Sequence, residues 1–186
     1  MRFLLRLTPL DLPRERALGT VRALAKSVGA DARNPKWTSY GALELDLFCP
    51  SRADFELFLS AVRPLANLEF ARDLNVAPPH KPENELFAEA RDLFNEERYW
   101  ECHEVLEGVW RVKEGGEKRF LQGIILVCAA FVHHQKGEDA VAFSVMGRAS
   151  KQLEYPEGGY HGIDVLALQR DVSKVLGGKR FFCFRI

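Results

Sequence analysis

The sequence predicts an α+β protein in two parts, a small module of strands and helices followed by a bundle of helices. Three observations lead to this prediction. Residues 1–74 alternate between strand-like and helix-like patterns, residues 83–178 keep helical spacing almost throughout, and a polar, proline-rich stretch at 75–82 separates them. We therefore expect domains at 1–74 and 83–178, a linker at 75–82, and a C-terminal tail at 179–186.

The first part begins with a strand, a helix and two further strands. Residues 2–8 alternate apolar and polar side chains, as a half-buried strand does. A helical pattern follows, which we expect Asp11 to cap and Gly29 to end. Two strand-like runs come next, at 36–40 and 42–48.

A second helix and a fourth strand complete this part. Ser51 with Asp54 three residues later forms a capping box, and Leu68 and Phe70 mark the last strand. The order βαββαβ is that of a ferredoxin-like module, in which two helices cover one face of an antiparallel sheet. The open face would carry charged side chains that form intramolecular ion pairs: Arg2, Arg6, Glu44, Asp46 and Glu69.

Helical spacing dominates beyond the linker, interrupted by glycine and proline. We expect helices near residues 83–94, 97–113, 117–136, 138–154 and 162–176, with one of the breaks at 156–159. The last residues, 181–186, resemble a short strand that could add to an edge of the N-terminal sheet.

Composition excludes several classes of protein. The chain of 186 residues carries 26 basic and 26 acidic side chains, and the acids of the open sheet face argue against RNA, so we expect no nucleic-acid partner. No apolar run is long enough for a membrane span, and the start lacks signal-peptide features, so we expect a cytoplasmic protein. Its four cysteines lie far apart, without a C-x-x-C pair.

Polar side chains intrude on the apolar stripe of the helix expected at 97–113. At about 100° per residue, His103 and Glu107 flank the stripe one turn apart, where they can share a proton or a metal ion. Trp100 belongs to the same flank and would shield the pair from water. Glu101 and Glu104 lie furthest from the stripe, and we expect surface or interhelical salt bridges for them.

The next helix is apolar nearly all round, with two polar exceptions on one line. Gln122 and His133 project on the same side, and each needs a partner, since an unsatisfied polar group there costs on the order of 1–3 kcal/mol. We expect the preceding antiparallel helix to supply these partners. His134 is interpreted as a satisfied helix-end histidine, and His80 and His161 as solvated loop residues.

The string FNEERYWECHEVLEGVW, followed by FLQGIILVCAAFVHH, resembles the DUF309 family of small helical proteins. The resemblance covers roughly residues 84–175 and implies a compact helical bundle without a defined reaction. Residues 97–98 depart from it, because family members often have glycine before the tyrosine-tryptophan pair. The family's characteristic polar positions correspond to Trp100, Glu101, His103, Glu104, Glu107, Gln122, Gly123 and His133.

Two functions remain open for these residues. In the first, the protein is a non-enzymatic binding or assembly protein whose buried pocket contains Trp100, His103, Glu107, Gln122 and His133, and whose partner is another protein or a second copy. In the second, it is a metal-dependent hydrolase. His103, Glu107 and His133 would hold zinc, iron or manganese, with Glu104 or Glu101 as general base. A hydrogen-bond network without a metal uses the same side chains.

Overall fold

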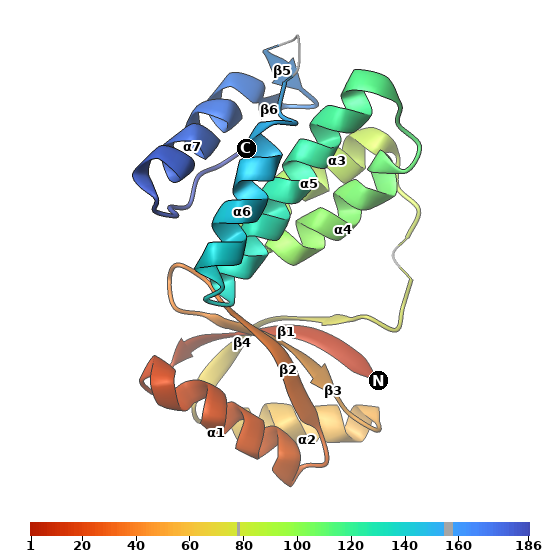
Figure 1. Ribbon diagram of the computed structural model, residues 1–186. Coiled ribbons are helices and arrows are strands. Elements are labelled where there is room, and N and C mark those ends of the chain that lie inside the picture. Colours follow the sequence, from red (N-terminus) through yellow and green to blue (C-terminus); the bar gives the residue numbers. More distant parts are fainter. Residues whose placement is uncertain (78, 155–157) are drawn as a thin grey trace. The chain divides into compact units, whose positions relative to one another are not determined.

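The computed structural model describes residues 1–77, 79–154 and 158–186 and has the predicted α+β class (Figure 1). The chain divides into two compact units, Met1–Pro79 and His80–Ile186. Each unit has a hydrophobic core of its own. Pro78, in the expected linker, and residues 156–157, in the expected break, lie outside the described residues.

The first unit is an antiparallel sheet of four strands in the order β2-β3-β1-β4, with two helices on one face (Figure 1). This is the predicted βαββαβ arrangement. Alternate side chains of the central strands, such as Leu5 and its partner Leu45, pack with the helices in one core. The elements are β1 (Arg2–Leu10), α1 (Arg14–Ser27), β2 (Asp31–Trp37), β3 (Leu43–Phe48), α2 (Arg52–Val62) and β4 (Ala66–Asp73).

Two local predictions in this unit differ from the structure. The strand expected at 36–40 is β2, which begins at Asp31 and ends at Trp37, because Thr38 already belongs to the turn toward β3 and donates its N–H to Ala42 O. A register shift between Arg33 and Lys36 accommodates Pro35 on this edge strand. Helix α1 has Pro13 at its N-cap and no side-chain cap, so Asp11 does not cap it. The capping box of Ser51 and Asp54, in contrast, is present on α2.

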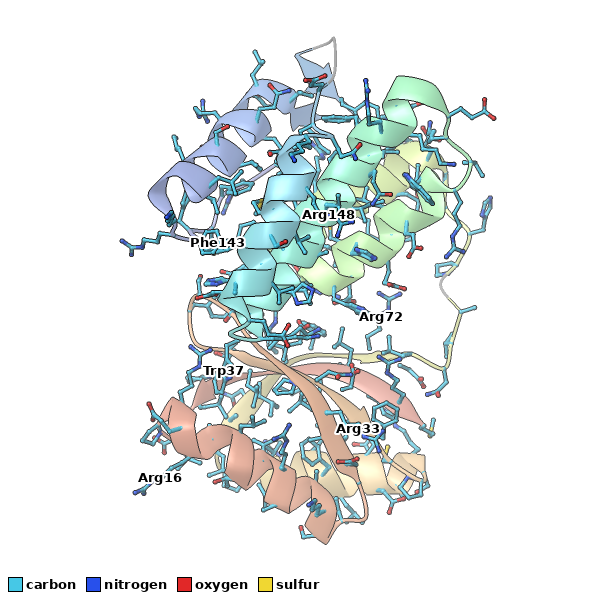
Figure 2. All side chains as sticks on the ribbon, viewed as in Figure 1. Arg16, Arg33, Trp37, Arg72, Phe143 and Arg148 are labelled. Carbon is cyan, nitrogen blue, oxygen red and sulfur yellow. The ribbon has the colours of Figure 1, made fainter. Side chains whose placement is uncertain are left out.

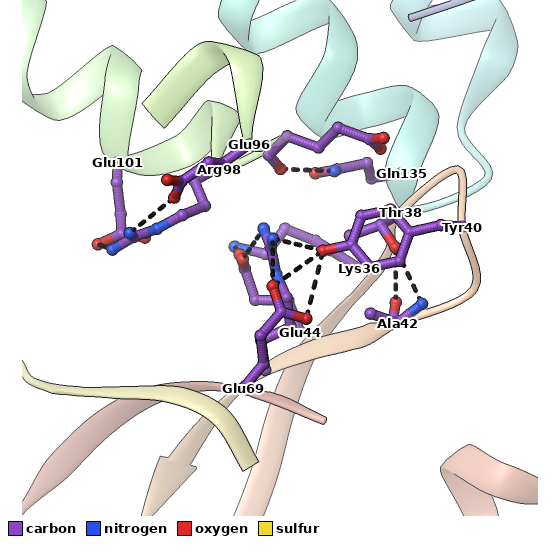
Figure 3. Close-up of polar contacts among 12 residues, drawn as sticks. Lys36, Thr38, Tyr40, Ala42, Glu44, Glu69, Glu96, Arg98, Glu101 and Gln135 are labelled. Carbon is purple, nitrogen blue, oxygen red and sulfur yellow. Dashed lines mark hydrogen bonds and ion pairs between the residues drawn. The ribbon is translucent and has the colours of Figure 1, made fainter. Parts of the chain in front are cut away.

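The open face of this sheet carries the expected ion pairs. Glu44 accepts from Arg6 at 2.9 Å and from Lys36 at 2.5 Å, and Arg2 pairs with Asp46 at 2.7 Å. Figure 3 shows Glu44 and Lys36 close together on this face. The charges are therefore neutralised in pairs within the unit itself.

The second unit is a helical bundle with a very small hairpin. Helix α5 is buried nearly all round and packs against both α4 and α6. The hairpin of β5 and β6 was not expected from the sequence. No helix in the described parts of the chain has the length and apolarity that crossing a bilayer requires. The elements are α3 (Glu83–Asn95), α4 (Tyr99–Trp110), α5 (Gly115–Gln135), α6 (Asp139–Ser150), β5 (Gly159–Tyr160), β6 (Ile163–Asp164) and α7 (Val165–Gly178).

The C-terminal tail, residues 179–186, forms no strand and packs on the bundle instead. The ring of Phe181 lies 5.4 Å from that of Phe131 and 4.8 Å from that of Phe143, which Figure 2 labels on α6. Phe184 lies 5.6 Å from Phe94. The alternation that resembles a strand therefore arises because the tail turns aromatic rings toward an aromatic cluster of its own unit.

Candidate functional site

Helices α4 and α5 form the antiparallel pair that the site prediction requires. The Sγ atoms of Cys102 and Cys128 lie 3.4 Å apart, and the rings of Tyr99 and Phe131 stack at 4.5 Å. In both contacts an early residue of α4 meets a late residue of α5. The short turn after Trp110 thus returns the chain along α4, and the polar positions of the two helices occupy neighbouring surfaces.

His103 lies beside Glu107 on α4, as their spacing predicts. The distance from His103 Nε2 to Glu107 Oε2 is 3.7 Å, and the other carboxylate oxygen of Glu107 lies 3.5 Å from Arg111. Glu104 joins them, so that three potential ligand atoms lie within 4.8 Å of one another. The side chains of His103 and Glu107 are 29% and 37% exposed, which makes the pair accessible from solvent.

His133 lies at the end of α5 and pairs with a carboxylate of the following turn. Gly137 has a φ of +79°, and its N–H donates to His134 O while the N–H of Glu138 donates to His133 O, which is a Schellman motif. This turn brings Glu138 Oε2 to 2.5 Å from His133 Nδ1. The hydrogen bond to His133 lowers the pKa of Glu138.

The ligand atoms of His103, Glu107 and His133 therefore do not converge within 4.8 Å of one another. Glu138 was not expected as the partner of His133. The sequence does carry a signal for this contact, because Gly137 can end the helix and Glu138 follows it directly. His134 has a local partner of the same kind, Asp139 at 2.7 Å, and agrees with its interpretation as a helix-end histidine.

Gln122 and Trp100 are half-buried on α5 and α4. Together with His103, Glu107 and His133 they make up what we call the α4–α5 strip. Gly123, beside Gln122, lies against the segment after α6, because a Cβ at this position would meet Leu153 Cδ2 at 2.8 Å. A glycine there allows the close packing that positions this end of α5.

Glu101, one of the two candidate general bases, is held by Arg98. Its two carboxylate oxygens accept from Arg98 at 2.7 and 2.8 Å (Figure 3). Burial alone would lower the pKa of Arg98, but the hydrogen bonds that Arg98 donates to Glu101, and then to Glu96, raise it. A salt bridge is thus present for Glu101, but its partner belongs to the same helix, since Arg98 is the N-cap residue of α4. Glu101 therefore has a structural role as an ion-pair partner.

A second polar cluster joins α3, α5 and the β5–β6 hairpin. Lys113 Nζ lies 2.7 Å from Glu83 and 3.0 Å from Glu117, and Tyr160 donates to Glu117 at 2.8 Å. His161 Nε2 lies 3.5 Å from Glu83. Glu83, Glu117 and His161 offer ligand atoms within 4.8 Å of one another. Lys113 already supplies a positive charge to both carboxylates, so these side chains form ion pairs with one another. The cluster thereby connects α3, α5 and the β5–β6 hairpin.

His161 differs from its interpretation as a solvated loop residue. Its ring stacks on Phe87 with centroids 4.0 Å apart and an interplanar angle of 10°. Phe87 is 74 positions away in the sequence, so no local pattern indicates the contact. His80, in contrast, is exposed, in agreement with its interpretation.

Two hollows on the bundle lie away from the strip. One of about 400 Å³ follows α3 from Glu85 to Glu96, and one of about 250 Å³ lies between α6 and α7, with Gln169 in its wall. No residue of the α4–α5 strip lines either of them. The side chains of His103, Glu107 and His133 are between 29% and 37% exposed. The strip is therefore a part-exposed surface, whereas the sequence predicted a buried pocket.

Comparison with known proteins agrees with the resemblance seen in the sequence. The family model described as a domain of unknown function, DUF309, matches residues 87–145. No curated protein matches the chain significantly. Among solved structures, a conserved hypothetical protein from Thermus thermophilus is 32% identical, with a TM-score of 0.44. The match covers 53% of this chain and 99% of that chain.

Proposed function

The C-terminal half of this chain is a DUF309 domain, a family without a defined function, so we propose a function from the chain's own side chains: it is a binding or assembly protein. The α4–α5 strip would contact another protein or a second copy of this chain. One observation carries the proposal. The ionisable groups of the strip are accessible and yet already paired with nearby carboxylates, His103 with Glu107 and His133 with Glu138.

Carboxylates that already have a partner suit a binding surface for a physical reason. An unpaired carboxylate loses its hydration when a second protein covers it, which opposes binding, whereas a carboxylate that contacts a neighbouring side chain keeps that contact in the complex. Trp100 is half-buried in the same strip, and tryptophan is enriched at the energetically important positions of interfaces. A mixed aromatic and polar surface of this kind favours recognition of a protein.

The pairing of the acids also favours binding over catalysis. A general base must lie within hydrogen-bond reach of the proton that it removes, and an ion pair with a cation makes a carboxylate less basic. Glu101 accepts hydrogen bonds from two nitrogen atoms of Arg98, and Glu107 is shared between His103 and Arg111.

Site-specific photo-crosslinking in cells tests the proposal. A photoactivatable residue in place of Gln122 is expected to give one discrete adduct, and mass spectrometry of that adduct identifies it as a second copy or as another protein. The matched control is the same substitution at Arg170, an exposed residue of α7. The double variant H103A/E107A is expected to reduce the adduct at least fivefold. Equal adducts at both positions, or none at Gln122, would contradict the proposal.

A metal-dependent hydrolase is the second candidate, and one observation favours it. His103, Glu104 and Glu107 offer three ligand atoms within 4.8 Å, a suitable set for zinc, iron or manganese. Glu104 would then be a ligand and not a general base. Equilibrium dialysis against zinc, and then against manganese or iron, should show one ion per chain that His103→Gln abolishes and Glu117→Gln retains. Retention of the ion by His103→Gln rejects this candidate.

A further inference from the structure

Two cysteines from neighbouring helices meet in the core of the bundle. Cys102 on α4 and Cys128 on α5 are both fully buried, and their Sγ atoms lie 3.4 Å apart as thiols that hydrogen-bond to each other. We propose that they form an oxidisable dithiol, which a hydroperoxide converts into a disulfide that joins α4 to α5. This inference does not depend on the proposed function, since it requires no partner and no metal.

The two sulfur atoms already lie close together. A disulfide has an S–S distance of about 2.05 Å, so the two sulfur atoms must approach by only about 1.3 Å. We expect rotation of both side chains, together with a small approach of the two helices, to close this distance. The stacked rings of Tyr99 and Phe131, one turn away, hold the two helices in the required register.

The oxidation is balanced with a hydroperoxide as the oxidant. One thiol loses its proton and attacks the terminal oxygen of the hydroperoxide, whose O–O bond breaks to release an alcohol and leave a sulfenic acid. The second thiol attacks the sulfur of the sulfenic acid, and water leaves as the S–S bond forms. Two electrons and two protons pass from the dithiol to the hydroperoxide. A dithiol reductant reverses the reaction by thiol–disulfide exchange.

Access of the oxidant determines the rate. Burial raises the pKa of the Cys102 thiol, and so does its hydrogen bond with Cys128, so that little thiolate is present at neutral pH. The oxidant must therefore enter through brief local opening between α4 and α5. Cys183, which is exposed on the tail, is expected to react earlier than the buried pair.

The disulfide would stabilise the hairpin that carries the α4–α5 strip. It would close the segment between residues 102 and 128 and so restrict the unfolded chain. Cys102 precedes His103 directly, so the cross-link would also hold the beginning of the strip against α5. Oxidation is thus expected to make this part of the bundle more rigid.

Peptide mapping of the full chain tests the inference. The wild-type protein is treated with hydrogen peroxide, alkylated in denaturant and digested with trypsin. We expect peptide 99–111 to be linked to peptide 120–136, and the link to disappear with dithiothreitol. The unfolding temperature of the oxidised bundle should rise by about 5 °C or more.

The controls are Cys102→Ala and Cys128→Ala, which should give no linked peptide and no rise in unfolding temperature. The mapping of the wild-type chain needs no variant and so remains decisive if either variant fails to fold. The inference is overturned if both thiols are still alkylated when Cys183 is fully oxidised and exposure to peroxide is prolonged. It is also overturned if the link forms only in unfolded protein, or if both sulfurs become sulfinic acids.

Discussion

Gly123 illustrates how a single residue controls the packing of the bundle. It lies in α5, where the chain segment after α6 passes so close that a side chain does not fit without movement. A Cβ at this position would lie 2.8 Å from Leu153 Cδ2 and 3.1 Å from the carbonyl carbon of Gln152. The side chain of Leu153 can adjust, but the backbone of Gln152 must shift with the whole turn.

Overpacking by the added methyl group of Gly123→Ala is expected to cost about 1–3 kcal/mol. Because alanine normally stabilises a helix by about 1 kcal/mol relative to glycine, the net loss in the free energy of unfolding should be up to about 2 kcal/mol, measured by chemical denaturation. The matched control is Gly147→Ala in α6, where no atom lies within 4 Å of the added Cβ, and it should be neutral or stabilising. Similar effects of the two substitutions would show that the contact does not limit the packing.

Glu117 supplies a prediction of pH dependence at the same scale. The hydrogen bond from Tyr160 is the main cause that lowers its pKa; burial opposes this, and the hydrogen bond from Lys113 supports it. A carboxyl group with a lowered pKa in the folded state stabilises the fold above its unfolded pKa of about 4.3. That contribution is lost as the pH falls through the folded pKa.

Tyr160→Phe should thus raise the pKa of Glu117 and reduce the stability at pH 7 by about 1 kcal/mol. The difference from wild type should shrink in acid, below the lowered pKa of Glu117, because the protonated carboxyl group accepts only a weaker hydrogen bond. Chemical denaturation at pH 7 and at a series of lower pH values measures this difference. In a Glu117→Gln background the same substitution should have a smaller effect, and an equal effect would mean that Tyr160 acts through packing alone.

Among the helices, local sequence patterns predicted where each one lies, but they did not always predict the residue at which it begins. Helix α2 begins at its predicted capping box, whereas α1 begins after Pro13, whose ring provides a suitable backbone angle without any side-chain cap. The tail shows the same limit. Its aromatic residues are compatible with either a strand or an irregular segment. The segment is irregular because its rings pack against the aromatic cluster of the bundle.

Phe181→Ala should destabilise the bundle by about 2–4 kcal/mol, because this ring is buried against Phe131 and Phe143. The neighbouring Phe182 is 38% exposed, so Phe182→Ala serves as the control and should change stability by no more than about 0.5 kcal/mol. Thermal and denaturant unfolding measure both variants. Equal losses would indicate that the tail contributes to stability without its specific aromatic contacts.

At the scale of the whole molecule, two hydrophobic cores share no residue. One core belongs to the sheet and its two helices, and the other belongs to the bundle and its tail. Each unit therefore has the burial that an independent domain requires. The division after Pro79 falls within the polar, proline-rich stretch that the sequence predicts to be a linker.

Fragments 1–79 and 80–186, produced separately, are each expected to fold and to unfold cooperatively. Circular dichroism and denaturant titration check this expectation. Phe181→Ala should then destabilise the second fragment by about as much as it destabilises the bundle in the full chain, since its contacts lie within that fragment. A fragment without a cooperative transition would show that its core is incomplete without the other unit.

Local sequence patterns were enough to predict the class of the fold, the order of most elements and the pairing of His103 with Glu107. These features depend on periodicity and spacing within one helix or strand, and such local information is present in any short stretch of chain. The DUF309 resemblance is likewise confirmed over residues 87–145, since its motifs lie on two consecutive helices.

Only the tertiary structure decided which distant groups meet. It paired His133 with Glu138 through the turn after α5, stacked His161 on Phe87, and brought Cys102 beside Cys128. The physical reason is that such contacts depend on how helices pack and where turns end. Many combinations of packing are compatible with the same hydrophobic pattern, and the folded chain selects one of them through the sum of its contacts.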